Sequence, residues 1–146
     1  MRNHVRFHSA EFTPPDSEPG QINMNRYGYA LATWVGARLA ERGFEASTPT
    51  PEDWGWLLGV MNNGQTVRIG CGNIDGSMTE WLIWLEADVP GVFARLFKRE
   101  APAPNALYGV VAAIHGALSA NASVKDVEWF RVGSRGEELD HGTTPV

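Results

Sequence analysis

The feature that most constrains the fold of this chain is a hairpin signal near its centre. Two apolar segments, 54–61 and 66–72, flank the tetrapeptide Asn62-Asn63-Gly64-Gln65. An Asn-Gly pair is typical of a two-residue type I′ turn, because both central residues of that turn need a positive φ. The sequence therefore predicts a central antiparallel hairpin whose register is set by the turn.

That register divides the side chains of the hairpin between two unlike faces. The apolar face pairs Val60 with Val67, Leu58 with Ile69, and Trp56 with Cys71. The other face pairs Gly59 with Arg68, Leu57 with Gly70, and Gly55 with Gly72. We therefore expect one face to pack in a core and the second, glycine-rich face to carry few side chains.

Helices and further strands complete the predicted fold. Apolar residues at i, i+3, i+4 and i+7 predict a helix over 25–42, with Asn25 as its N-cap and Gly43 just beyond its end. The other expected elements are a third strand over 80–87, a short helix near 93–97, a second main helix over 105–120 and a last strand over 124–132. This order indicates an α+β fold in which a three- to five-stranded antiparallel sheet packs against two main helices in two layers.

The domain organisation follows from where these patterns begin and end. The whole chain has 146 residues, which is about one domain, and residues 25–132 carry all the strong patterns. Residues 1–24 are predicted to be an N-terminal arm or edge strand followed by a proline-rich loop. Residues 133–146 are polar and are predicted to be a flexible tail.

Composition and charge exclude several classes of partner. The net charge of −5 disfavours binding to nucleic acid and to anionic lipid, both of which need a basic patch. The first 25 residues contain no apolar stretch, and the single cysteine implies no intramolecular disulfide. We therefore expect a cytoplasmic protein with neither a membrane nor a nucleic-acid partner.

Few residues combine into a catalytic or metal-binding pattern. Cys71 is the only thiol, and His115 is the only histidine within the predicted core elements, so these two would be the catalytic candidates. Burial of Cys71 among apolar neighbours is the favoured alternative. His4 and His8 would share a metal only in a helix, whereas their neighbours alternate as in a strand. We expect no metal site and no cofactor.

One part of the chain resembles a family of small bacterial proteins that has no assigned activity. The resemblance rests on Glu41–Phe44, on the Pro-x-Pro-Glu-Asp-Trp-Gly-Trp segment Pro49–Trp56, on Gly70–Asn73 and on Trp81–Trp84. It covers somewhat under half of the chain and implies a bacterial origin. Its most specific run makes Glu52, Asp53 and Trp54 a candidate motif site.

The six tryptophans suit either a Trp-rich core or a binding surface. The second sheet face is the predicted binding surface, with Leu57, Met61, Arg68, Leu82 and Trp84. The favoured function is a non-enzymatic protein-interaction or self-associating domain, which acts as a homodimer or binds another protein. One alternative is a small-molecule-binding protein that uses the glycine-rich face. Others are an immunity- or inhibitor-type protein that binds a basic partner, and, least favoured, a thiol enzyme that uses Cys71.

Overall fold

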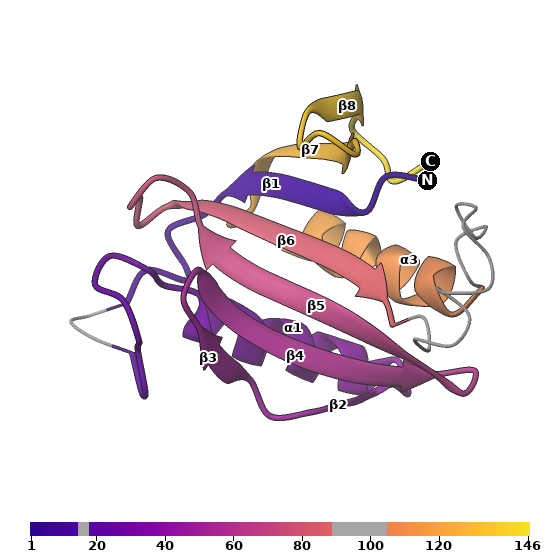
Figure 1. The fold of residues 1–146 in the computed structure, drawn as a ribbon, viewed down its shortest axis with the longest axis horizontal. Coiled ribbons are helices and arrows are strands. Elements are labelled where there is room, and N and C mark those ends of the chain that lie inside the picture. The colour runs from indigo at the N-terminus through magenta and orange to yellow at the C-terminus, as the bar shows by residue number, and fades with distance from the viewer. Residues whose placement is uncertain (15–17, 89–104) are drawn as a thin grey trace.

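Among the described residues, an antiparallel sheet of eight strands forms one layer, and two helices lie on the same side of it (Figure 1). The structure is a computed structural model and describes residues 1–14, 18–88 and 105–146. Its elements are β1 (His4–His8), α1 (Tyr29–Glu41), β2 (Glu45–Ala46), β3 (Thr50–Glu52), β4 (Gly55–Asn62), β5 (Gln65–Asn73), β6 (Glu80–Ala87), α3 (Asn105–Ala120), β7 (Lys125–Val132) and β8 (Glu138–Gly142). This arrangement confirms the α+β class.

The central hairpin has the predicted turn and the predicted register. Asn63 and Gly64 have φ angles of 49° and 73°, as a type I′ turn requires. Val60 lies opposite Val67 and Leu57 opposite Gly70, and the intervening pairs follow the same register. Turn chemistry and side-chain alternation therefore specify the same pairing.

The sheet is larger than the three to five strands predicted. Its order is β2-β4-β5-β6-β1-β7-β8, and β3 also pairs with β4. The extra strands β2, β3 and β8 are short and have no apolar alternation that could mark them in the sequence. They cover backbone N–H and C=O groups that β4 and β7 would otherwise expose at the sheet edges.

Both ends of the chain are more ordered than the sequence suggested. β1 is a central strand between β6 and β7, not an edge strand. Residues 133–146, predicted to be a flexible tail, contain β8, and the Arg2 N–H donates to the carbonyl of Pro145 at 2.8 Å. The two termini therefore lie side by side (Figure 1).

Helix α1 is shorter than the predicted 25–42, and its N-cap is not Asn25. Asn25 has a φ of 63° and lies outside the helix, which begins at Tyr29. The buried carboxylate of Glu18 instead accepts the backbone N–H groups of Gly28 and Tyr29, at 2.7 and 2.8 Å. At the other end, Gly43 has a φ of 84° and the Phe44 N–H donates to the Leu39 carbonyl, as predicted for a C′ glycine.

The core lies between the inner face of the sheet and the two helices. Trp81 and Trp129 are fully buried there, and Trp56 is almost so. Strand β6 and helix α3 have their predicted bounds, while the short helix expected near 93–97 lies outside the described residues. No helix within the described ranges is both long and apolar enough to span a membrane.

Candidate functional site

The outer face of the sheet, which points away from α1 and α3, carries all five residues of the predicted binding surface. Gly70 lies between Leu57 and Trp84, Arg68 lies between Gly59 and Glu86, and Leu82 lies opposite Gly72. Because paired residues point to the same side of a sheet, these side chains share one surface. No helix or strand of the described ranges packs over that surface (Figure 1).

Trp84 occupies the space that the glycines leave on this face. A Cβ atom on Gly70 would lie 2.1 Å from both Nε1 and Cε2 of Trp84, so the indole lies directly over the glycine. The indole of Trp54 contacts it, with ring centroids 5.3 Å apart. The chain's own side chains therefore fill the space that a planar ligand would need over Gly70.

The contact between Trp54 and Trp84 joins the candidate motif site to the predicted binding surface, which the sequence predicts as separate sites. Trp54 follows β3 in the turn to β4 and is 37% exposed. In the same segment, the Asp53 carbonyl accepts a hydrogen bond from the Asn23 side chain at 2.7 Å, and Glu52 ends β3. Among the three residues of the candidate motif site, Trp54 is the one whose side chain contacts the outer face, through Trp84.

Aromatic rings continue from Trp84 across the outer face to the far edge of the sheet. His4 lies between Trp84 and Phe130 in the register. The ring of Phe130 lies 5.4 Å from that of His4 and stacks on that of His141 at 5.7 Å. We call these side chains and Trp54 the aromatic row: Trp54, Trp84, His4, Phe130 and His141.

A network of ion pairs borders the aromatic row on β1, β7 and β8. The Arg6 guanidinium contacts Glu128 at 2.6 Å and Glu138 at 3.0 Å, and it lies 5.2 Å from the centre of the Phe130 ring. His141 Nδ1 lies 3.0 Å from the Glu128 carboxylate. The hydrogen bond from Arg6 is the main cause that lowers the pKa of Glu128. The network therefore holds Arg6 and the His141 ring in place beside the row.

A smaller group of charges lies at the opposite end of the outer face. Arg68 contacts Glu86 at 2.8 Å and Asp88 at 3.7 Å. Between the two charged borders lie the apolar side chains of Leu57 and Leu82, which are half-buried. Met61, at the end of β4, is 59% exposed. The outer face thus has an apolar and aromatic centre with polar borders.

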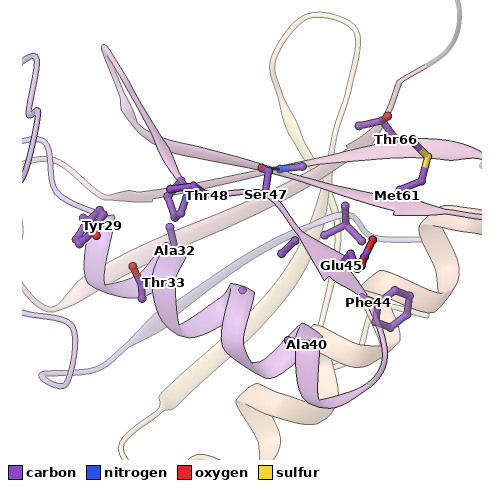
Figure 2. A pocket seen from close by; sticks show the side chains of 15 residues that line it. Tyr29, Ala32, Thr33, Ala40, Phe44, Glu45, Ser47, Thr48, Met61 and Thr66 are labelled. Carbon is purple, nitrogen blue, oxygen red and sulfur yellow. Dashed lines mark hydrogen bonds between the residues drawn. The ribbon is translucent and has the colours of Figure 1, made fainter.

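An open groove of about 1090 Å³ lies between α1 and the segment 45–49 (Figure 2). Small residues of α1, Ala32 and Ala40 among them, form one side, and Phe44 lies at one end (Figure 2). Glu45 is the only acidic or basic residue in its lining. Hydroxyl groups also line the groove, so it has both the apolar walls and the polar groups of a binding pocket. It is open, however, whereas ligand pockets bury most of a ligand's surface, and it is therefore a weaker candidate site than the outer face.

The structure does not bring the catalytic candidates together into a reactive pair. Cys71 is fully buried on the inner face, and burial raises the pKa of its thiol. Among the described residues, no hydrogen bond connects Cys71 with His115, whose ring instead packs on Trp129 at 5.9 Å. A thiolate is the form that acts as a nucleophile, so this environment suits a core residue.

Metal binding has no support in the described part of the chain. His4 and His8 lie at opposite ends of β1. No group of three or more histidine, cysteine, aspartate or glutamate side chains in the described ranges is arranged to hold a metal ion.

Comparison with known proteins adds no relative. No family model, no curated protein and no solved structure matches this chain. The function is therefore inferred from the arrangement of its side chains.

Sequence reasoning missed the half of the outer face that β1, β7 and β8 supply. Arg6 is more than a hundred residues from both Phe130 and His141, so no local spacing relates it to them. The alternation of His4, Arg6 and His8 with Val5 and Phe7 was the only available signal.

Proposed function

We propose that this chain is a non-enzymatic protein-binding domain and that the outer face of its sheet is the contact surface. The observation that carries the proposal is the aromatic row, with Leu57, Met61 and Leu82 beside it, on a face that no described element covers. Tryptophan, methionine and arginine are enriched in the centres of protein interfaces. Arg6 and Arg68 supply the last of these at the borders of the face.

Two features favour a protein partner over a small molecule. The space over Gly70 is filled by Trp84, and the outer face has no hollow at its apolar centre among those found in the described residues. The half-buried side chains of Leu57, Leu82 and Trp84 are instead spread over the two strands β4 and β6, with the exposed Met61 at the end of β4. A broad, shallow surface of this kind suits contact with another protein surface.

The test compares substitutions on the outer face with one on the helix side. Leu57→Glu and Leu82→Glu place a charge on the proposed contact surface and leave the inner face and the groove untouched. Tyr108→Glu is the matched control, because Tyr108 is 45% exposed on α3. Native mass spectrometry measures self-association, and affinity capture followed by protein identification measures binding of other proteins.

The proposal expects a bound protein, or a second copy, that is lost with both outer-face variants and kept with Tyr108→Glu. Circular dichroism of each variant must show an unchanged fold. A bound protein or second copy that both outer-face variants keep would overturn the proposal, as would the absence of any association.

A further inference from the structure

The charges of the outer face point to the kind of partner, and we infer that it is a cationic protein surface rather than a second copy of this chain. This inference rests on the proposed function, because it uses the same face. Carboxylates outnumber the arginine beside the aromatic row, and some of them line a hollow there.

Arg6 and Arg68, the arginines of the two ion-pair groups described above, each contact two carboxylates. Arg6 contacts Glu128 and Glu138, and Arg68 contacts Glu86 and Asp88. Neither arginine therefore offers a free positive charge to a partner. The borders are negative on both sides of the apolar centre.

A hollow of about 410 Å³ adds two further carboxylates beside the Arg6 network. Arg6, His8, Glu80, Asp126 and Glu128 are the polar residues that line it. Within the described ranges, Glu80 and Asp126 are in no ion pair, so no described side chain neutralises their charges. A lysine or arginine side chain of a partner can enter this open hollow and pair with both.

The hollow lies next to the apolar centre. Leu82 of β6 is directly opposite Arg6 of β1 in the register, and Glu80 is opposite His8. A partner that inserts a basic side chain into the hollow therefore lays its neighbouring residues on Leu82 and Trp84. Apolar contact at the centre and ion pairs at the border are the usual division of an interface.

The same charges disfavour self-association. Two copies placed face to face would bring negative borders close together, in a chain whose net charge is −5. Pairing at one of the two sheet edges is also disfavoured. One edge consists of the short strands β2 and β3, and Pro51 within β3 cannot donate a backbone hydrogen bond.

The probe for this inference is a short synthetic peptide that alternates arginine with phenylalanine. Two counterparts test the two parts of the face: one alternates glutamate with phenylalanine, and the other alternates arginine with glycine. Binding to the full chain is measured by protein tryptophan fluorescence, since the peptides contain no tryptophan. The oligomeric state of the chain alone is measured by light scattering.

We expect a monomer that binds the arginine–phenylalanine peptide about tenfold more tightly than either counterpart. Raising the salt concentration from about 50 to about 200 mM should weaken that binding. Glu80→Gln combined with Asp126→Asn should weaken it about fivefold. Glu41→Gln combined with Glu137→Gln, which removes the same charge outside the hollow, should leave it unchanged.

Failure of this inference is distinguishable from failure of the proposed function. A dimer that Leu57→Glu dissociates would overturn the cationic partner and keep the outer face as a contact surface. Equal binding of the acidic and basic aromatic peptides would also overturn the cationic partner, and it would keep the outer face if Leu57→Glu weakens both. Binding that responds to neither set of variants would overturn both.

Discussion

At the scale of single residues, Gly70 and Trp84 show how the outer face acquires its shape. Trp84 can lie across β5 only because residue 70 has no side chain. This contact holds the indole against the sheet and leaves its edge beside Trp54. The glycine is thus required by packing, whereas the sequence alone left open a small-molecule site on the glycine-rich face.

Gly70→Ala should destabilise the protein by about 1–3 kcal/mol, the usual cost of an overpacked site. The new methyl group would lie 2.1 Å from indole atoms of Trp84, so that side chain must move. Urea denaturation measures the loss, and tryptophan fluorescence reports the displaced indole.

Gly59→Ala is the control, because a Cβ atom there would meet only ordinary contacts, the nearest at 3.6 Å from the Thr66 side chain. An equal loss of stability in both variants would contradict the account of Gly70.

His4 should make the stability of the protein depend on pH. Burial is the main cause that lowers the pKa of His4, and the nearby charge of Glu138 offsets this in part. The unfolded chain, in which the pKa of His4 is about 6.5, then binds the proton more readily than the folded chain. The contribution of neutral His4 to the free energy of unfolding is therefore complete above about pH 6.5. It is lost as the pH falls through the lower pKa that His4 has in the folded chain.

The measurement is the urea midpoint at about pH 7.5 and about pH 5.5. We expect the midpoint to fall on acidification in the natural chain and to fall less in His4→Gln. Glu128 and Glu11, whose pKa values are lowered from 4.5, contribute mainly below this range. An identical pH dependence in the two proteins would exclude His4 as its source.

At the scale of elements, helix α1 depends on a residue outside it for its start. The side chain of Glu18 accepts hydrogen bonds from the Gly28 and Tyr29 N–H groups and from the Trp56 indole N–H. A carboxylate at this position also complements the positive end of the helix dipole. Glu18 therefore joins the N-terminal loop, α1 and β4 at one point.

Glu18→Gln should lower the free energy of unfolding by about 1–3 kcal/mol, because one of the buried donors loses a charged acceptor. Chemical denaturation monitored by circular dichroism measures the change. Glu80→Gln is the matched control: Glu80 is exposed and its carboxylate has no partner among the described residues, so we expect a change within about 0.5 kcal/mol. Similar values for the two variants would contradict the capping role.

At the scale of the whole molecule, the sheet separates a core from a contact surface. The inner face holds Trp56, Trp81 and Trp129 under the two helices, whereas Trp54 and Trp84 lie on the outer face. The six tryptophans therefore do not form one group. The single cysteine lies on the core side of this division.

Cys71 should react slowly with a thiol reagent in the folded protein and rapidly in denaturant. The residue is fully buried and burial raises the pKa of its thiol, so little thiolate is present and little of it is accessible. The chain has no other cysteine, so the label reports this site alone. Rapid labelling of the folded protein near neutral pH would favour the thiol-enzyme hypothesis instead.

The sequence by itself determined those features that depend on neighbours along the chain. The Asn63-Gly64 turn, the register of β4 with β5, the C′ glycine at Gly43 and the bounds of α3 follow from local backbone preferences and short periodicities. All of these are present in the structure.

Only the tertiary structure decided the features that join distant segments. The place of β1 between β6 and β7 and the hydrogen bond between Glu18 and the Trp56 indole join segments that are far apart in sequence. The same holds for the outer face, where Trp54 meets Trp84 and Arg6 meets Glu128 and Glu138. The physical reason is that a local pattern specifies which way a side chain points, whereas strand order specifies which side chains it meets.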